Sequence, residues 1–372
     1  MEKERLEQLV NIKTGKLNAN ASDENGVYPF FTCSKETLRI NKYSYDCECV
    51  LVAGNGDLNA KYYNGKFDAY QRTYILTNKD KDKLNLKYLY YFMQNYVETL
   101  RNQSIGGVIK YIKLENLTEA KINLVSLERQ EEIINTLQKA EEIINERKRQ
   151  IENLQILVKS QFVEMFGNLS ENTMHWKEYD INKIVKGNLN NGYFAKRNEY
   201  VENGNVEIIG VASVVNRMFS NIDNLPMTNA NKQDIEKYRV RYGDLLFCRS
   251  SLVAEGIGKA SIVPKNVKSN QLFECHVIRM HLNLNECVPE YIQKLTEDNY
   301  FRKQLMKGAK TATMTTIGQN DILKCKVLLP PIELQNKFAS FVEQIDKQKF
   351  EELKSEKLLK NLIDEGAKNV KF

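Results

Sequence analysis

Apolar side chains recur along residues 127–168 at spacings that alternate between four and three residues, the pattern of a coiled-coil helix. The stretch contains no proline, and its first glycine is Gly167. Two polar residues, Arg147 and Gln161, interrupt an otherwise apolar repeat. The repeat positions are Ile133, Leu137, Ala140, Ile144, Arg147, Ile151, Leu154, Val158, Gln161 and Met165. The pattern predicts one long helix over residues 127–168.

A second apolar stripe follows Pro330 and Pro331 and predicts another long helix over residues 332–372. Its apolar positions are Phe338, Phe341, Val342, Ile345, Leu353, Leu358, Leu359, Leu362 and Ile363, with a polar gap at residues 347–349. A helix of about 40 residues is roughly 60 Å long and must bury its apolar stripe. We expect the two helices to pack on each other as an antiparallel pair within the chain. Alternatively, each helix packs on its own domain or pairs with another chain.

The remaining sequence repeats itself. Sliding the chain by 205 residues brings Ile112 onto Ile317, Lys121 onto Lys326 and Gln130 onto Gln335. A shift of 195 residues lays CVLVAGNG on DLLFCRSS, and each segment is typical of a buried strand that ends in small polar residues. We therefore predict an α/β (α+β) fold in which two α/β globular domains, residues 1–126 and 169–331, form a tandem repeat separated by the long helices.

Length and composition favour an ordinary globular protein. The 372 residues suit two or three domains, and a content of 42% hydrophobic and 27% charged residues argues against disorder. No apolar run approaches the length of a membrane span, and the opening MEKERLEQLV lacks the apolar core of a secretory leader. We therefore expect a cytoplasmic protein.

The seven cysteines form no regular framework, and an odd number in a reducing compartment favours free thiols. Cys275, His276, His281 and Cys287 lie close together in the sequence and resemble a metal-binding group. However, FECHVIRMHL alternates as a half-buried strand does, and the paired CxxC spacing of a zinc site is missing. We interpret these residues as structural and expect neither a metal nor a cofactor.

The positive charge is concentrated outside the long helices. Residues 127–163 carry six Lys or Arg against seven Asp or Glu, and residues 332–372 carry eight against eight. Because the whole chain has a formal charge of +6, an excess of seven positive charges is left for the globular domains. An anionic partner is therefore expected to bind there.

The sequence lacks recognisable catalytic motifs. Residues 256–259 (GIGK) do not have the spacing of a phosphate-binding loop, and Pro330-Pro331 lacks the flanking residues of an adenine-methyltransferase motif. No nuclease core stands out, and the chain holds three histidines for acid or base work. We expect a protein that is not an enzyme. Two alternatives stay open: a self-sufficient nuclease or methyltransferase with a cryptic site, and a coiled-coil scaffold that does not bind DNA.

Polar, aromatic and basic residues gather on the turns between predicted strands. Asn, Gln and Arg side chains pair with base edges, while Lys, Tyr and hydroxyl groups reach phosphates. The alternative for any one of them is an ordinary hairpin with solvated side chains. The candidate DNA-binding residues are Asn55, Asp57, Lys61, Tyr62, Tyr63, Lys66, Gln71, Arg72, Lys110, Tyr111 and Lys113 in the first domain, and Lys196, Arg197, Arg249, Ser250, Ser251, Lys259, Lys310, Thr311, Thr313 and Thr315 in the second.

Together, the segments NGVYPFFTCSKE, VLVAGNGD, YYNGKFDAYQRTYIL and GGVIKYIKLENL and the two Glu-x-Gln helix openings resemble the specificity subunit of type I restriction-modification systems. The resemblance spans essentially the whole chain. It implies target-recognition domains at 1–126 and 169–331, each reading one half of a bipartite, asymmetric DNA target. It also implies that the helices at 127–168 and 332–372 set the spacer, and that the chain recruits methyltransferase subunits and, through them, restriction and translocase subunits.

Overall fold

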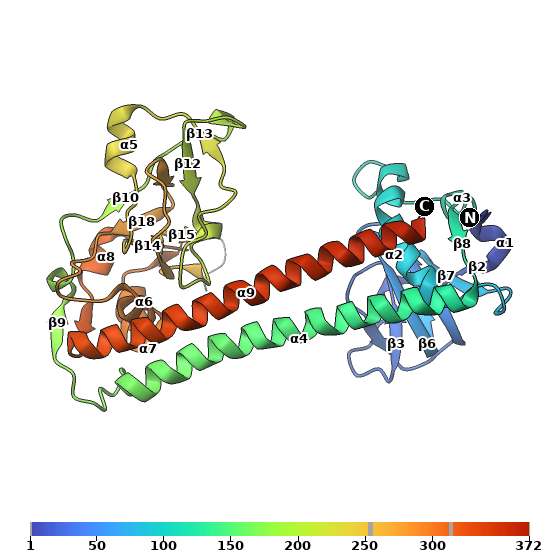
Figure 1. The fold of residues 1–372 in the computed structure, drawn as a ribbon, viewed down its shortest axis with the longest axis horizontal. Helices are drawn as coiled ribbons and strands as arrows, with labels where there is room; N and C mark the ends of the chain where they lie inside the picture. Colours follow the sequence, from blue (N-terminus) through green and yellow to red (C-terminus); the bar gives the residue numbers. More distant parts are fainter. Residues whose placement is uncertain (1, 252–255, 312–314, 372) are drawn as a thin grey trace. The chain divides into compact units, whose positions relative to one another are not determined.

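The computed structural model describes residues 2–251, 256–311 and 315–371, and it divides into two compact units (Figure 1). Unit 1 comprises Met1–Gln150 and Glu351–Phe372, and unit 2 comprises Ile151–Phe350. Two long helices, α4 (Leu127–Phe166) and α9 (Ile332–Lys371), contribute residues to both units. The predicted α/β fold with two long helices is therefore confirmed. No helix in the described ranges combines the length and the apolar character that a membrane span needs.

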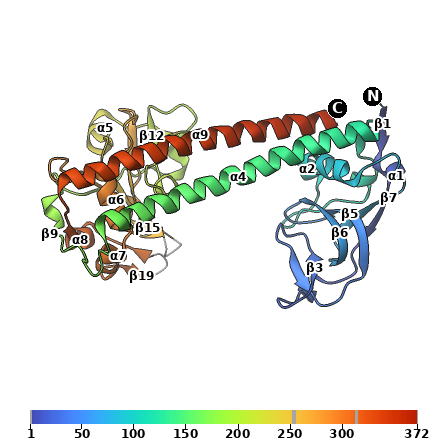
Figure 2. The same cartoon turned by 60° about the horizontal axis from the view of Figure 1, so that its bottom comes forward.

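Unit 1 is built on a six-stranded sheet that packs against helix α2 (Figure 2). The strand order is β2-β7-β5-β6-β3-β4, and the pairing of β3 with β6 is parallel while the others are antiparallel. Strands β1 and β8 form a separate ladder. The elements are β1 (Glu2–Arg5), α1 (Leu6–Leu9), β2 (Val10–Thr14), β3 (Tyr28–Phe31), β4 (Leu38–Ile40), β5 (Tyr45–Ala53), β6 (Ala60–Ala69), β7 (Thr73–Asn78), α2 (Leu86–Gln103), α3 (Glu115–Thr118) and β8 (Lys121–Leu124).

The central strand β5 is buried on both faces, which explains its continuous apolar sequence. Val50 and Val52 point into the cluster that includes α2, while Cys49 and Leu51 point into a second cluster with Phe31 and other residues. Successive side chains of a strand alternate between the faces of a sheet, so a strand covered on both sides needs apolar residues at every position. The CVLVA segment was therefore correctly interpreted as a buried strand.

Unit 2 contains two four-stranded sheets, ordered β10-β18-β14-β16 and β11-β13-β12-β17, with smaller ladders formed by β15-β20-β19 and β21-β9. Its elements between the long helices are β9 (Glu178–Asp180), β10 (Asn190–Asn191), β11 (Tyr200–Val201), β12 (Val206–Ile209), β13 (Met227–Thr228), α5 (Lys232–Tyr238), β14 (Leu245–Cys248), β15 (Ser250–Ser251), β16 (Ala260–Ile262), β17 (Gln271–Phe273), β18 (Val277–Met280), α6 (Pro289–Glu297), α7 (Asn299–Met306), β19 (Lys310–Thr311), β20 (Thr315–Thr316), α8 (Gln319–Leu323) and β21 (Lys326–Leu328).

The two units share the same central strand pairing. In unit 1, β5 lies between β6 and β7, and in unit 2, β14 lies between β16 and β18. Val50 pairs with Leu76 in the first unit, and Leu245, which lies 195 residues further on, pairs with Met280. The ladder that precedes each long helix is repeated as well, because Lys121 pairs with Arg5 and Lys326 pairs with Asp180. The tandem repeat inferred from the sequence is therefore a structural duplication.

Within unit 2, the end of α4 packs against the beginning of α9. The ring centroids of Phe162 and Phe338 lie 5.4 Å apart, and those of Phe166 and Phe338 lie 5.6 Å apart. Helix α4 ends at Phe166, and Gly167 adopts a left-handed conformation (φ 73°) that suits the residue after a helix. The helices run antiparallel here, as predicted.

Within unit 1, the beginning of α4 packs against the end of α9, again antiparallel. Arg147, which interrupts the predicted repeat of α4, forms an ion pair with Glu352 at an N–O distance of 2.7 Å. Two predicted seam residues of α9, Leu353 and Leu358, are instead exposed, with 45% and 63% of their surface accessible. That part of the expected seam is wrong because α9 turns Glu352 and the buried Glu356 inward, and Arg147 supplies a charge partner for Glu352.

A buried glutamine anchors the first turn of each long helix. The Gln130 side chain accepts a hydrogen bond from the Asn85 backbone N–H (2.8 Å) and donates one to the Val125 carbonyl (2.8 Å). The Gln335 side chain accepts from the Val288 N–H (3.0 Å) and donates to the Pro330 carbonyl (2.8 Å). Both glutamines are at most 1% exposed. The Glu-x-Gln openings therefore tie each long helix to its own globular part.

The segment FECHVIRMHL is not one half-buried strand, as the alternation predicted. Strand β17 ends at Phe273, Glu274 forms an isolated bridge with Tyr193, and residues 275–276 form a turn in which His276 is exposed. All four residues of β18 are buried. The prediction failed because β18 is a central strand covered on both faces. The cysteines are free thiols, and the described residues contain no group of three or more His, Cys, Asp or Glu placed to hold a metal ion.

We predict that Gln335→Ala lowers the free energy of unfolding by about 1–3 kcal/mol, because it leaves the buried Val288 N–H and Pro330 carbonyl without partners. Urea denaturation of the full chain measures the change. Gln348→Ala, at an exposed position on the same helix, is the matched control and should change stability by less than about 0.5 kcal/mol. Equal effects of the two substitutions would remove the anchoring role of Gln335.

Candidate nucleic-acid interface

Three chain segments meet at the end of the central strand of unit 1. The Gly54 N–H donates to the Arg72 carbonyl (2.8 Å), and the Ile112 N–H donates to the Gly54 carbonyl (2.9 Å). Asn55 is bridged to Tyr111 in antiparallel fashion. We call this set of residues, Gly54–Asn55, Arg72 and Tyr111–Ile112, junction 1. It joins the end of β5, the turn before β7 and the loop after α2.

Close packing of backbone makes Gly54 necessary at junction 1. A Cβ atom on this residue would lie 2.4 Å from the Arg72 carbonyl oxygen, far inside van der Waals contact. The neighbouring loop is closed by two hydrogen bonds between Ile105 and Tyr111, with N–O distances of 3.0 and 2.9 Å. The tip of this loop exposes Val108 and Ile109. The closely packed backbone of junction 1 thus holds the exposed loop of residues 105–111 beside the exposed Arg72.

The same junction is built in unit 2. The Arg249 N–H donates to the His276 carbonyl (2.9 Å), and the Ile317 N–H donates to the Arg249 carbonyl (3.0 Å). Ser250 pairs with Thr316, as Asn55 pairs with Tyr111. We call Arg249–Ser250, His276 and Thr316–Ile317 junction 2. Its backbone bonds match those of junction 1, whereas its side chains differ.

Side-chain hydrogen bonds fix part of junction 2. The Ser250 hydroxyl lies 2.5 Å from Nδ1 of His276, and the Arg249 guanidinium donates to the Cys275 carbonyl (3.2 Å). Ser250 is 6% exposed, while His276 is exposed. The junction therefore holds an imidazole ring at the surface through a nearly buried hydroxyl.

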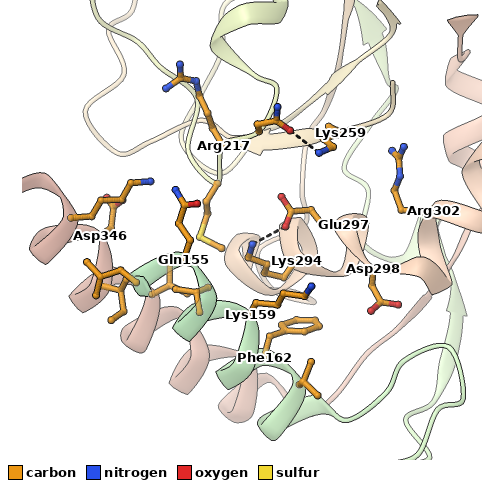
Figure 3. Close-up of a pocket in the computed structure, with 18 of the residues that line it drawn as sticks. Gln155, Lys159, Phe162, Arg217, Lys259, Lys294, Glu297, Asp298, Arg302 and Asp346 are labelled. Atoms are coloured by element: carbon orange, nitrogen blue, oxygen red, sulfur yellow. Dashed lines mark hydrogen bonds and ion pairs between the residues drawn. The ribbon is translucent and has the colours of Figure 1, made fainter. Parts of the chain in front are cut away.

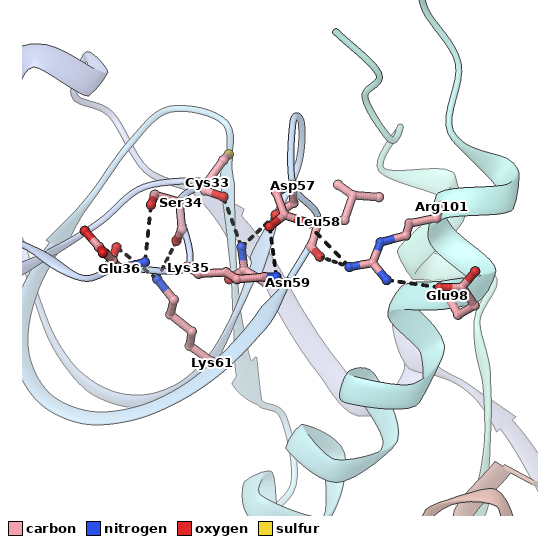
Figure 4. A network of polar contacts seen from close by, with 10 residues as sticks. All are labelled: Cys33, Ser34, Lys35, Glu36, Asp57, Leu58, Asn59, Lys61, Glu98 and Arg101. Atoms are coloured by element: carbon pink, nitrogen blue, oxygen red, sulfur yellow. Dashed lines mark hydrogen bonds and ion pairs between the residues drawn. The ribbon is translucent and has the colours of Figure 1, made fainter. Parts of the chain in front are cut away.

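A polar network surrounds the β5–β6 turn next to junction 1 (Figure 4). Asp57 forms ion pairs with Lys35 (3.2 Å) and Arg101 (3.6 Å). The Lys61 ammonium donates to the Ser34 carbonyl (2.7 Å), and burial lowers the pKa of Lys61. Asp57 and Lys61 thus already have partners within the protein, and Lys61 braces the loop after β3.

A family model described as type I restriction modification DNA specificity domain matches residues 1–153 and again residues 174–360. The chain belongs to this specificity-domain family. The two matched ranges correspond to the two copies of the repeat, so each junction lies in its own match.

Curated relatives of this specificity-domain protein carry related names. The EcoDI specificity subunit of Escherichia coli is 33% identical over 179 residues, covering 48% of this chain and 40% of that protein. The MjaVIII specificity subunit of Methanocaldococcus jannaschii is 22% identical over 401 residues, covering 99% of this chain and 92% of that protein. The chain thus spans less than half the length of the EcoDI relative and most of the MjaVIII relative.

Solved structures show the same fold along the whole chain. The type I restriction-modification S subunit from M. genitalium superposes with a TM-score of 0.58 at 18% identity, covering 99% of this chain and 95% of that one. A chain from a study of complex assembly and conformational transition of the type I R-M system gives a TM-score of 0.55 at 12% identity, with 99% and 97% coverage.

The predicted residues of the first specificity domain separate into two groups. Those at or next to junction 1 are Asn55, Asp57, Gln71, Arg72, Lys110, Tyr111 and Lys113. Tyr62, Tyr63 and Lys66 lie instead along strand β6. The Tyr62 hydroxyl donates to Glu48 (2.8 Å), and burial with this bond raises the pKa of Tyr62 to about 12. The Lys66 ammonium lies over the Tyr43 ring at 4.7 Å.

In the second specificity domain, Arg249, Ser250, Ser251 and Thr315 lie at or next to junction 2. Lys310 and Thr311 form β19, and Thr313 lies outside the described residues. Lys196 and Arg197 lie elsewhere, exposed at the start of a short 3-10 helix (Arg197–Glu199) before β11. The backbone of Lys259 accepts a hydrogen bond from Cys248 (2.8 Å), and its ammonium donates to Asn216 (2.6 Å).

Lys259 also lines a cavity of about 540 Å³ in unit 2, beside α6 and α7 (Figure 3). Its charged lining residues are Lys159, Arg217, Lys259, Lys294, Arg302 and Lys349, with Glu297, Asp298 and Asp346. Lys294 pairs with Glu297 (2.7 Å), and the Arg302 guanidinium donates to the Ile257 carbonyl (2.6 Å). Burial, together with the nearby cations Arg217 and Lys294, lowers the pKa of Lys349 despite the opposing charge of Asp346.

His276 was not among the candidate residues predicted from the sequence. In junction 2 it occupies the position that Arg72 has in junction 1. The residue was interpreted as part of a half-buried strand, but it lies on an exposed turn. A third alignment, at a shift of 204 residues, would have placed QRTYIL (71–76) on CHVIRM (275–280), yet these segments share no residue at matching positions. The equivalence of Arg72 and His276 is therefore visible in the strand pairing of the two units and not in their residue types.

We predict that Gly54→Ala destabilises the protein by about 1–3 kcal/mol, because the new methyl group overlaps the Arg72 carbonyl and forces the junction apart. Thermal denaturation followed by circular dichroism measures the loss. Gly107→Ala is the matched control, since a Cβ atom there meets no atom within 4 Å. The account of junction 1 fails if both variants melt like the unsubstituted protein.

Proposed function

We propose that the chain is the DNA specificity subunit of a type I restriction-modification complex, and that it works in the cytoplasm. Each unit binds one half of a bipartite, asymmetric target through its junction and the loops around it. The chain itself is not catalytic, and methylation and cleavage belong to the methyltransferase and restriction subunits that it recruits. The relatives named as specificity subunits of type I restriction enzymes support this assignment.

The observation that carries the proposal is the repetition of one backbone junction with unlike side chains. Arg72 in unit 1 corresponds to His276 in unit 2, and Asn55 corresponds to Ser250. Sequence readout depends on donors and acceptors that match base edges, so different side chains on the same backbone select different bases. Two such junctions in one chain suit a target with two unlike halves.

The charge distribution supports a DNA partner. The long helices are nearly neutral, and an excess of seven positive charges belongs to the remaining sequence. Exposed Lys110 lies in the loop of junction 1 and exposed Lys113 follows it, and from there both can contact phosphates. We propose that the candidate residues around each junction divide between base contacts and phosphate contacts.

We also propose that α4 and α9 set the number of base pairs between the half-sites and provide the surface on which methyltransferase subunits dock. Each helix is 40 residues long, or about 60 Å at 1.5 Å per residue. This length corresponds to roughly two turns of B-DNA at about 34 Å per turn.

The test of the proposed function is a genome-wide map of methylated adenines in cells with and without this gene, with its methyltransferase partner present in both. We expect one asymmetric motif with two short specified halves and an unspecified gap, seen only when the gene is present. The purified complex should bind that motif with an affinity that falls steeply with salt. Identical maps in the two strains would refute the proposal.

We predict that four residues inserted both in α4 after Arg149 and in α9 beside Phe350 lengthen the unspecified gap by about one to two base pairs. Four helical residues add about 6 Å, against about 3.4 Å per base pair of B-DNA. Inserting in both helices keeps the antiparallel pairing seen at Arg147 and Glu352. The methylation motif is the readout, and Arg149→Ala is the length-preserving control. An unchanged gap in the insertion variant contradicts the spacing role.

A further inference from the structure

We propose that His276 is a base-contacting residue of unit 2, and that its Nε2 atom makes one hydrogen bond to the edge of a base in the half-site that this unit reads. This inference rests on the proposed function, because it names a residue that determines specificity at one of the two junctions. The sequence pattern had placed His276 within a half-buried strand, and the structure places it on an exposed turn.

The position of His276 follows from the duplicated backbone. The Arg72 carbonyl accepts from Gly54, the residue after strand β5, and the His276 carbonyl accepts from Arg249, the residue after strand β14. Each acceptor residue directly precedes the strand that pairs with that central strand, β7 or β18. His276 therefore presents its side chain from the same backbone site as Arg72, and both residues are exposed.

The ring of His276 is oriented by a hydrogen bond to Ser250. The Ser250 hydroxyl lies 2.5 Å from Nδ1 and is carried by a residue that is 6% exposed. Strand pairing with Thr316 fixes the backbone of Ser250 in turn. In the described part of the chain, no residue forms a hydrogen bond or ion pair with Nε2. A ring held by one nitrogen and open at the other is suited to bind an external group.

His281 shows what a structural histidine looks like in the same unit. Its Nδ1 lies 2.5 Å from a carboxylate oxygen of Asp244, whose side chain is 4% exposed, and its own side chain is 26% exposed. Asp244 also accepts a hydrogen bond from the Arg241 backbone N–H (2.9 Å). His281 therefore belongs to a polar network centred on the buried Asp244, whereas the ring of the exposed His276 has one partner among the residues that the structure describes.

The chemistry of the ring limits what it can read. When the Ser250 hydroxyl donates to Nδ1, the proton of the neutral ring is on Nε2, which then donates to an acceptor. The acceptors on base edges in the major groove are N7 and O6 of guanine, N7 of adenine and O4 of thymine. Arg72 can engage two acceptors at once, whereas His276 offers a single bond. The two half-sites should therefore differ at the base pairs that these residues contact.

The experiment uses the full chain in complex with its methyltransferase subunits and duplexes that carry the mapped motif. Each base pair of both halves is replaced in turn, and dissociation constants are measured for the unsubstituted complex and for the His276→Ala and Arg72→Ala variants. We expect His276→Ala to lose about tenfold in affinity for the intact motif and to become indifferent to one base pair in one half. We expect Arg72→Ala to lose about 10- to 100-fold and to become indifferent to a base pair in the other half.

Two further variants separate base contact from a general structural effect. Ser250→Ala should weaken discrimination at the base pair that His276→Ala affects, because the ring loses its orienting partner. His175→Asn is the matched control, since His175 is an exposed histidine on the turn after α4 and asparagine tolerates its positive φ of 54°. This control should leave all dissociation constants unchanged.

The outcomes distinguish this inference from the proposed function. If the unsubstituted complex binds every duplex equally, the proposed function fails, and the inference fails with it. If the complex discriminates among duplexes but His276→Ala keeps that discrimination, or loses equal affinity for the motif and for random DNA, the inference alone is overturned. If His276→Ala and Arg72→Ala affect the same half-site, the assignment of His276 to a separate half is overturned.

Discussion

The hydrogen bonds that end the central strand of each unit are the constraint on which the rest of the site depends. The backbone N–H of Gly54 in unit 1, like that of Arg249 in unit 2, donates to a carbonyl in the turn before a neighbouring strand, at Arg72 or His276. The carbonyl of the same residue accepts from the N–H of a third segment, at Ile112 or Ile317. Because backbone atoms make these bonds, the bonds do not depend on the identity of exposed side chains such as those of Arg72 and His276. The lack of space at Gly54 shows how closely the segments approach. Side chains around the junction can therefore vary without loss of the frame.

If each unit reads one half-site as proposed, this separation of frame and side chain explains how one fold serves two readers. The core residues keep the strand pairing, the buried glutamines Gln130 and Gln335 tie each long helix to its globular part, and the exposed residues at the junction remain free to differ. Direct readout of DNA needs few side chains if they are held rigidly. Arg72 and His276, presented from equivalent backbone sites, provide different hydrogen-bonding patterns.

The sequence predicted the parts of the structure that depend on burial. The heptad pattern located α4, and the shifts of 195 and 205 residues correctly matched the central strands and the glutamine anchors of the two units. It could not predict features set by partners distant in sequence. Leu353 and Leu358 look like seam residues until the Arg147–Glu352 pair is known, and His276 looks like a strand residue until β18 is seen to begin at Val277. The roles of the candidate residues in DNA binding remain predictions.

The most direct test of the central claim, that each unit is an independent reader on a common frame, is to exchange residues 1–126 for the first domain of another member of the family. The methylation motif is then mapped genome-wide. The account predicts that one half of the motif changes to that of the donor protein while the other half stays the same. A motif that changes in both halves, or in neither, would contradict it.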